Sequence, residues 1–310
     1  MPEVSVIMNV RNGAATLREA IDSVLAQSFA DWELVVWDDA STDGTPAIVS
    51  DYRNSRIRYL RGDRSAGLGR ARDAAIRAAT GTWLAFLDQD DLWLPEKLAS
   101  QLSLAGPETG LVYGRTVAFS GARWERDYDH RHEFADLPEG DIFETLFADS
   151  CFVSMSSAML RRSLVNALGA IPDEIETCPD YWLFLAVTAS NPARAVQTVV
   201  CRYRVHSGSM SRQRARRVDE EMLWLLDQWQ WRLPADLVAW RRRVLNTLLA
   251  VEDLRRPGHR WSGLARLWRE GSLPYLLSRP AARAWRSVRR TVATPRWRLA
   301  APRAGGQVTA

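Results

Sequence analysis

The chain has 310 residues, 46% of them hydrophobic and 25% charged, and this composition predicts a folded protein with at least one large core. Its three scattered cysteines exclude a disulfide-stabilised scaffold and a zinc site built from paired cysteines, and they favour a reducing compartment such as the cytoplasm. No apolar run approaches the roughly 18 residues that a membrane-spanning helix needs, and the N-terminal segment lacks the basic start of a signal peptide.

Charge is distributed unevenly along the chain. Residues 1–210 carry 20 Lys and Arg against 29 Asp and Glu, whereas residues 211–310 carry 21 against 8. Nearly all of the positive charge is arginine, because Lys97 is the only lysine. The sequence therefore consists of an acidic part followed by a basic part with a different chemical character.

The first 95 residues alternate strand and helix patterns. Val4–Val10, Trp32–Trp37 and Ile57–Arg61 are short apolar runs that end in turn residues, as strands do. Apolar residues at helical spacing in 17–25 and a proline at position 46 predict a helix after each of the first two strands. A third helix is predicted in the alanine-rich segment 68–80, followed by a fourth strand at 82–88.

Strands and helices that alternate at this spacing predict a parallel sheet with right-handed crossovers, hence a doubly wound α/β fold. Ligands of such sheets bind at the carboxyl ends of the strands. Polar and acidic residues stand at those ends, namely Asn9 to Asn12, Asp38 and Asp39, Arg61 to Asp63, and Asp88 to Asp91.

From residue 92 onward the pattern changes to mixed α+β. Strands are predicted at 110–119, 154–162 and 199–206, and helices from Pro95, at 163–169 and at 179–189. Residues 121–139 have the polar composition of a loop. After Ser209 the chain has helical patterns rich in tryptophan and arginine.

The fourth strand ends in three closely spaced carboxylates, Asp88, Asp90 and Asp91, which repel one another unless their charge is compensated. Mg²⁺ and Mn²⁺ prefer oxygen ligands and are often held by one or two carboxylates together with substrate phosphates. The Asp-Gln-Asp tripeptide therefore predicts a divalent metal site at the strand end that leaves coordination positions open for a diphosphate. Asp91 either binds the metal as well or caps the helix that begins near Pro95.

Several segments resemble, in the same order, those of the family 2 inverting glycosyltransferases, which use nucleotide-sugar donors and have the GT-A fold. They are VSVIMNVRNGAATLREAIDSVLAQSFADWELVVWDDASTDGT, GRARDAAIRAATG, WLAFLDQDDLWLPEKL, AMLRRSLVNALGAIPDEIETCPDYWLFL and YRVHSGSMS, and they cover roughly residues 3–212. The resemblance implies a GT-A catalytic domain over 1–212, with a nucleotide-binding half at 1–95 and an acceptor half at 96–212. A helical extension at 213–300 and a disordered tail at 301–310 complete the expected organisation.

The resemblance also implies how the donor is bound. Asp39 matches the position that accepts a hydrogen bond from the pyrimidine base, with Asn9 lining the same pocket and Asp38 beside it. Arg72 matches the basic residue that faces the nucleotide. Arg11 also belongs to the donor site, but it stands where an aromatic residue is usual, so the base pocket differs from the family pattern.

The remaining implied roles concern the reaction itself. Asp90 would bind Mg²⁺ or Mn²⁺, Asp88 would bind the metal or orient the ribose, and His206 would bind the metal or touch the diphosphate. Asp180 matches the general base that takes the proton of the acceptor hydroxyl, although it could also cap a helix beginning at Tyr181. Two further departures, Asp73 for the usual Asn and Pro179 for an acidic residue, alter the surroundings of these residues.

The expected function is inverting transfer of a sugar from a UDP- or dTDP-type donor to a carbohydrate or lipid-linked acceptor, in surface polysaccharide or glycoconjugate biosynthesis. One alternative is a nucleotide-sugar-binding protein without activity, which the intact Asp39, Asp90 and Asp180 disfavour. The other is a nicotinamide- or adenosylmethionine-dependent enzyme, which the missing glycine-rich turn after the first strand disfavours.

The basic end of the chain supports two interpretations. From Arg255 onward there are thirteen arginines and a single acid, Glu270, interleaved with aromatic residues. Residues 255–300 either make peripheral contact with an anionic membrane, at the inner face where a lipid-linked acceptor lies, or pack on the catalytic domain as a helical cap. A nucleic-acid partner is not expected, because no recognition motif accompanies the charge.

Overall fold

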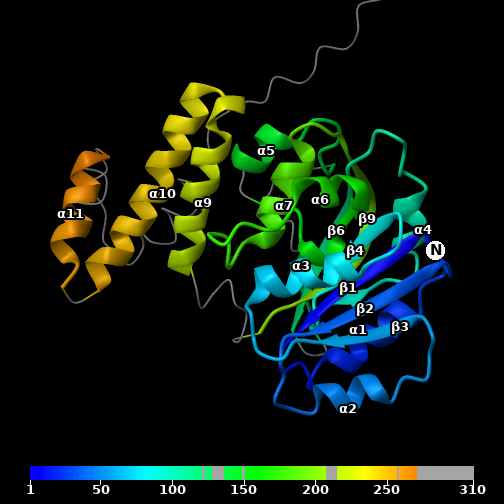
Figure 1. Ribbon diagram of the computed structural model, residues 1–310. Coiled ribbons are helices and arrows are strands. Elements are labelled where there is room, and N and C mark those ends of the chain that lie inside the picture. The colour runs from blue at the N-terminus through cyan, green and yellow to red at the C-terminus, as the bar shows by residue number, and fades with distance from the viewer. Residues whose placement is uncertain (121–122, 128–135, 149–150, 207–214, 257, 271–310) are drawn as a thin grey trace, which may run out of the picture. The chain divides into compact units, whose positions relative to one another are not determined.

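The computed structural model describes residues 1–270 apart from 121–122, 128–135, 149–150, 207–214 and 257 (Figure 1). The chain divides into two compact units, Met1–Leu245 and Asn246–Ala310. The predicted disordered tail at 301–310, and most of the basic segment 255–300, lie outside the described residues.

The N-terminal part alternates strands and helices as the sequence predicts. Four strands lie parallel in the order β3-β2-β1-β4, so that β1 is hydrogen-bonded to a neighbour on each side. The elements are β1 (Val4–Val10), α1 (Leu17–Leu25), β2 (Trp32–Asp38), α2 (Thr45–Ser50), β3 (Ile57–Arg61), α3 (Leu68–Ala78) and β4 (Trp83–Phe86).

The following elements extend the same sheet, which has nine strands in the described part of the chain. Strand β8 pairs antiparallel with β4 and β6, β6 pairs parallel with β9, and β5 pairs antiparallel with β9. The elements are β5 (Leu92–Trp93), α4 (Lys97–Leu102), β6 (Leu111–Ser120), β7 (Arg123–Asp127), α5 (Phe143–Ala148), η2 (Met155–Ser157), β8 (Met159–Arg161), α6 (Arg162–Leu168), α7 (Pro179–Thr188) and β9 (Ala193–Arg204). The result is a mixed α/β sheet with flanking helices.

The sheet separates two hydrophobic clusters. Because side chains of a strand alternate between faces, Val6 and Met8 of β1 join one cluster and Ile7 between them joins the other. Helix α1 covers the first cluster, and helices α3 and α7 cover the second. This arrangement places β1 in the middle of the core and leaves the strand ends free to carry polar residues.

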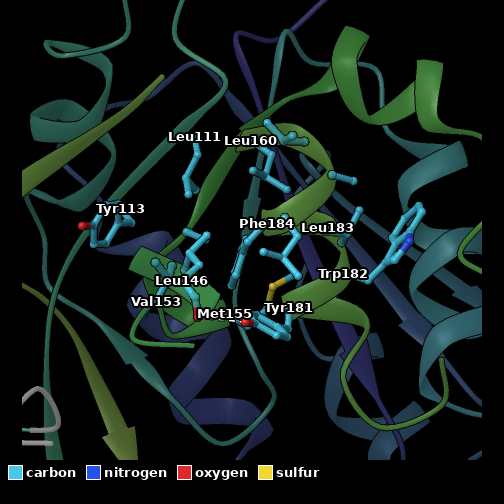
Figure 2. Close-up of a cluster of buried hydrophobic side chains, with 14 of the residues drawn as sticks. Leu111, Tyr113, Leu146, Val153, Met155, Leu160, Tyr181, Trp182, Leu183 and Phe184 are labelled. Atoms are coloured by element: carbon cyan, nitrogen blue, oxygen red, sulfur yellow. Dashed lines mark hydrogen bonds between the residues drawn. The ribbon is translucent and has the colours of Figure 1, made fainter. Parts of the chain in front are cut away.

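Helix α7 contributes to the second cluster, and Figure 2 shows its residues Tyr181 to Phe184 among the buried hydrophobic side chains. Nine of its ten residues are buried, and the phenol of Tyr181 donates a hydrogen bond to the carbonyl oxygen of Leu146 at 2.8 Å. A helix that is apolar on all sides belongs in a core. Asp180, in the first turn, is the residue of this helix that reaches partial exposure.

The first unit also contains the beginning of the predicted helical extension. Leu225 and Leu226 are fully buried in the second cluster, and Leu233 and Leu237 join them. The C-terminal helices are α9 (Ala215–Trp229), η3 (Gln230–Arg232), α10 (Ala235–Arg255) and α11 (Arg260–Arg269). None of the described helices has the length and apolar character that crossing a bilayer requires.

Helix starts and short elements differ from the sequence predictions. The helix expected from Pro95 begins at Lys97. The helix predicted at 179–189 spans Pro179–Thr188 with Cys178 as its N-cap residue, so Asp180 lies in its first turn and is not the cap. The strand predicted at 154–162 is a 3₁₀ turn followed by the three-residue strand β8. Proline is favoured in the first turn of a helix, but a local sequence pattern locates the ends of helices and strands only to within a few residues.

Candidate active site

The carboxyl ends of β1, β2 and β4 meet at one edge of the sheet, and the loops that follow them form the candidate site. Two loop residues, Asn12 and Ala40, have left-handed backbone, with φ of 51° and 58°. An alanine in this conformation is strained by on the order of 1–3 kcal/mol. Hydrogen bonds between the two loops hold the turn at Ala40 in place. The backbone amide of Asn12 donates to Ser41 Oγ at 2.9 Å, and the side-chain Oδ1 of Asn12 accepts from the amide of Thr42 at 2.8 Å.

Asp38, which the sequence places among the donor-binding residues, is fully buried in the structure. Its Oδ1 accepts a hydrogen bond from the amide of Ser41 at 2.7 Å, and its Oδ2 accepts one from the phenol of Tyr59 at 2.5 Å. Both carboxylate oxygens of Asp38 therefore form hydrogen bonds that stabilise the fold. Any contribution of Asp38 to donor binding is indirect, through the turn that carries Asp39.

Asp39 is held by the loop that precedes α3. Its Oδ1 accepts from the amide of Ala66 at 2.7 Å, and its Oδ2 accepts from Ser65 Oγ at 2.7 Å and from the amide of Gly67 at 3.3 Å. The guanidinium of Arg11 donates to the same Ser65 hydroxyl. The structure thus links Arg11 and Asp39 through the hydroxyl group of Ser65.

Two buried donors at this edge have no hydrogen-bond partner among the described residues. They are Asn9 Nδ2, near the end of β1, and Arg72 Nε, on α3. An unpaired buried donor costs about 1–3 kcal/mol, so such groups are rare in folded proteins unless a ligand or water satisfies them. Both residues were predicted to face the nucleotide, and both carry a donor that a ligand could use.

Arg72 forms an ion pair with Asp88, the first acid after β4, with 3.2 Å between Nη2 and Oδ1. The arginine side chain is almost fully buried, whereas the carboxylate is partly exposed to solvent. Burial raises the pKa of Asp88, Arg72 opposes that rise, and the carboxylates of Asp90 and Asp180 add to it. The same guanidinium opposes the rise in the pKa of Asp180 that burial causes. One buried cation therefore influences two acids that lie far apart in the sequence.

Asp90 and His206 meet directly, with 2.7 Å between Oδ2 and Nε2. Both side chains are partly exposed, and they lie in the segments that follow β4 and β9, two strands that are separated in the sheet by β8 and β6. The sequence resemblance assigned both residues to the metal. The structure brings them into contact at the predicted edge.

Asp91 has a different role from either alternative left by the sequence. It is buried, its Oδ1 accepts from the amide of Arg204 at 2.9 Å, and its Oδ2 accepts from Ser156 Oγ at 2.6 Å. Helix α4 begins at Lys97 after Glu96, so Asp91 is not its cap. The two hydrogen bonds of Asp91 instead join the acidic loop to β9 and to η2. Arg204 adds a further link, since its Nε donates to the carbonyl oxygen of Asp90 at 2.7 Å.

The donor set at this edge fits a hard divalent cation shared with a substrate. Asp90 supplies a carboxylate and His206 an imidazole, both accessible, with Asp88 two residues away. Within the described ranges, no group of three His, Cys, Asp or Glu side chains forms a cage around a metal position. Mg²⁺ and Mn²⁺ are commonly bound by one or two side chains when substrate phosphates complete the coordination. The residues fit that mode of binding.

The segment before Asp180 is anchored by a residue from another helix. Glu221 of α9 is buried, and its carboxylate accepts hydrogen bonds from the amides of Glu176, Thr177 and Cys178 at 2.8–3.0 Å. Arg217, one turn earlier on α9, forms an ion pair with Glu221 at 3.0 Å. Helix α9 therefore fixes the N-terminus of α7, where Asp180 lies.

Four residues that the sequence did not single out hold the candidate site together. Glu221 and Arg204 fasten its loops, Ser156 also accepts from the amide of Asp88 at 3.0 Å, and Gln89 Oε1 accepts from the amide of Arg11 at 2.9 Å. Gln89 lies between Asp88 and Asp90, two predicted site residues, and its place in the candidate site could have been predicted from that position. The other three are recognisable only from contacts between distant segments.

The mixed sheet with clustered acids at its edge has the GT-A fold, the fold of a class of glycosyltransferases. The chain is similar in structure to a mannosyltransferase from Pyrobaculum calidifontis, solved in complex with GDP-Man and Mn²⁺, with a TM-score of 0.60, 20% identity, and coverage of 94% of this chain and 85% of the other. It is also similar to residues 1–349 of TarS from S. aureus in complex with UDP-GlcNAc, with a TM-score of 0.59, 18% identity, and coverage of 86% and 73%. At these identities the likeness shows the fold.

The family follows from the sequence comparisons. Residues 5–169 match the family model for glycosyl transferase family 2, and the chain belongs to that family. An Escherichia coli relative, the UDP-Glc:alpha-D-GlcNAc-diphosphoundecaprenol beta-1,3-glucosyltransferase WfgD, is 30% identical over 210 residues, which cover 67% of this chain and 79% of the relative. The succinoglycan biosynthesis protein ExoO of Rhizobium meliloti is 32% identical over 222 residues, which cover 68% and 63%. Membership of this family excludes the dinucleotide- or adenosylmethionine-dependent alternative.

Proposed function

We propose that the protein transfers a sugar, with inversion, from a UDP- or dTDP-type nucleotide sugar to a hydroxyl group of a carbohydrate or lipid-linked acceptor, and that it requires Mg²⁺ or Mn²⁺. The observation that carries this proposal is the contact between Asp90 and His206 next to the ion pair of Asp88 with the buried guanidinium of Arg72, a cation that also opposes the rise in the pKa of Asp180. These groups lie on α3 and α7 and in the segments that follow β4 and β9, which are far apart in the sequence.

Asp39 and Asn9 bind the base in this proposal. Uracil and thymine both present an N3–H donor next to carbonyl acceptors, which suits a carboxylate beside an amide donor. Asn9 Nδ2 is available, since it has no partner among the described residues. Asp39 Oδ2 already accepts from Ser65, so base binding shares or replaces that hydrogen bond.

Asp90 and His206 would hold the divalent cation, with Asp88 beside them. When bound, the cation supplies positive charge that neutralises the departing nucleoside diphosphate. Arg72 adds a fixed guanidinium at the same edge, and its buried Nε is a donor suited to a phosphate or ribose oxygen. Its ion pair with Asp88 orients that carboxylate.

Asp180 acts as the general base. The acceptor hydroxyl attacks the anomeric carbon from the face opposite the diphosphate, so the new C–O bond forms as the old one breaks and the configuration inverts. The hydroxyl proton passes to the carboxylate of Asp180. Burial raises the pKa of Asp180, which increases its affinity for that proton, and Arg72 opposes this rise and favours the ionised form before transfer.

The names of relatives support a role in surface polysaccharide or glycoconjugate biosynthesis. The E. coli relative acts on a diphosphoundecaprenol-linked sugar, and ExoO is named for succinoglycan biosynthesis. By analogy, the acceptor here is a lipid-linked or growing carbohydrate at the inner face of the membrane, with the protein working in the cytoplasm in peripheral contact with that surface. A nucleic-acid partner is not part of the proposal.

The test begins with a donor screen by thermal shift, with and without Mn²⁺, followed by transfer assays with the donor identified. Asp180→Asn is expected to keep donor binding while transfer falls by about 10²–10⁴-fold. Asp173→Asn, in the exposed segment before α7, is the matched control and should be unaffected. Full transfer by Asp180→Asn would contradict its role as base. Donor binding without transfer to any acceptor by the unmodified protein would favour the binding-protein alternative.

A further inference from the structure

Helix α11, in the second unit, has one face fixed against the end of α10. Gly263 and Leu267 are buried, and a Cβ atom added at Gly263 would lie 2.7 Å from the carbonyl oxygen of Ala250 and 3.0 Å from the amide of Leu254. Such close approach of two backbones requires glycine. At the end of α11, Glu270 accepts a hydrogen bond from Asn246 at 3.0 Å. The orientation of α11 about its own axis is therefore defined within this unit.

The outward face of α11 carries large apolar side chains. Trp261 is 83% exposed, Trp268 is 77% exposed and Leu264 is 37% exposed. At about 100° per residue, these three positions lie within an arc of about 60°, and both tryptophans lie about 140–160° around the helix from Gly263. Two adjacent tryptophans this exposed mark a surface that meets another apolar phase.

Arginines border this apolar stripe on both sides. By the same helical geometry, Arg260 lies about 40° from one edge of the stripe and Arg269 about 80° from the other, and both are exposed. Tryptophan rings favour the headgroup level of a bilayer, and guanidinium groups bind lipid phosphates. An amphipathic helix with this pairing lies in the plane of an anionic membrane surface.

A second copy of the chain is a poorer occupant. A two-fold contact through the stripe would gather Arg260 and Arg269 of both copies around one interface without acidic partners from the stripe, and like charges at an interface oppose association. A bilayer that contains anionic phospholipid supplies both an apolar layer for the tryptophans and counter-charges for the arginines. Charge complementarity therefore selects the membrane.

We propose that Trp261, Leu264 and Trp268 of α11, bordered by Arg260 and Arg269, form a docking surface for the headgroup layer of an anionic phospholipid membrane. This surface would be the point at which the protein contacts the membrane in the peripheral location proposed above. Its role in sugar transfer rests on that proposed function. The binding itself needs no sugar substrate, so it can be measured independently of transfer.

The experiment uses the full chain and vesicles of phosphatidylcholine with or without phosphatidylglycerol, sedimented without substrates. Trp261→Ala with Trp268→Ala is expected to weaken binding to the anionic vesicles by about tenfold for each tryptophan. Arg260→Gln with Arg269→Gln is expected to weaken it by about thirtyfold at low salt and to reduce its salt dependence. Trp231→Ala, which removes a comparably exposed tryptophan from η3, is the matched control and should leave binding unchanged.

The outcomes separate the possible failures. Unchanged vesicle binding by the double tryptophan variant, or absence of binding by the unmodified protein, would overturn the docking surface. A dimer of the unmodified protein that the tryptophan variant loses in analytical ultracentrifugation would overturn it in favour of self-association. With a detergent-solubilised acceptor, the tryptophan variant should retain full transfer. Loss of vesicle binding together with intact transfer therefore supports the surface, whereas lack of transfer by every form is a failure of the proposed function alone.

Discussion

Glu221 holds the segment before the proposed base by accepting hydrogen bonds from three consecutive backbone amides. Its side chain is only 1% exposed, so water cannot replace a contact that is removed. In Glu221→Gln the side chain keeps its shape, but an NH₂ group now faces amide donors. A charge-assisted hydrogen bond contributes about 1.5–3 kcal/mol, and roughly half of these contacts are lost, so we expect the free energy of unfolding to fall by about 2–4 kcal/mol.

The functional consequence concerns Asp180, which lies two residues beyond the last anchored amide. Displacing a catalytic group by about 1 Å can cost about 100-fold in rate, so we expect kcat of Glu221→Gln to fall by about 10–100-fold. The KM for the nucleotide sugar should change little, because the proposed donor-binding residues lie on other loops. Glu221 also contributes to the raised pKa of Asp180, so removing its charge should move the acid limb of the kcat–pH profile to lower pH.

The assay combines chemical denaturation with initial rates at saturating donor across the acid range. Glu220→Gln is the matched control, because Glu220 is the neighbouring residue on α9 and pairs with Arg216 on a more exposed face. A variant that loses stability while keeping the kcat and pH profile of the unmodified enzyme would refute the reasoning. In that case the carboxylate of Glu221 would stabilise the fold without positioning Asp180.

Two further predictions concern the metal and the buried lysine. Asp90→Asn should abolish transfer and remove the Mn²⁺-dependent part of the thermal shift with donor, and undiminished transfer would contradict its role as ligand. Lys97 is fully buried, and burial lowers its pKa to about 7, below the value of about 10.4 expected in the unfolded chain. The unfolded chain therefore binds more protons between those values, so the stability of the unmodified protein should rise with pH relative to Lys97→Met, by at most about 1.4 kcal/mol per pH unit. A stability difference that stays constant from pH 7 to 10 would rule this out.

The N-terminal part of the fold could be predicted from sequence because its signals are local. Val4–Val10 and Ile57–Arg61 are strands with the predicted bounds, since each is a short apolar run closed by turn residues. Strand β5 was missed because its two residues, Leu92 and Trp93, are defined only by pairing with β9. A strand of that length has no pattern of its own.

The candidate site was predictable to the extent that its residues lie at strand ends. Asp90 and His206 were assigned to one site, and the structure places them in contact. The role of Asp91 was not predictable, because its partner Arg204 is 113 positions away and contributes a backbone amide, which every residue has. The anchoring role of Glu221 could not be predicted for the same reason, since its partners are backbone amides, which no sequence pattern identifies.

The family model ends at residue 169, but several parts of the candidate catalytic apparatus come from later in the chain. Arg204 and His206 complete the acidic loop, Glu221 anchors the helix of Asp180, and Leu225 and Leu226 close the core beneath it. A shortened enzyme prepared for crystallisation or glycan synthesis should therefore end no earlier than Leu245. A chain that ends at residue 212 would lack Leu225 and Leu226, so the part of the second hydrophobic cluster that they cover would be exposed to solvent. Such a protein should aggregate.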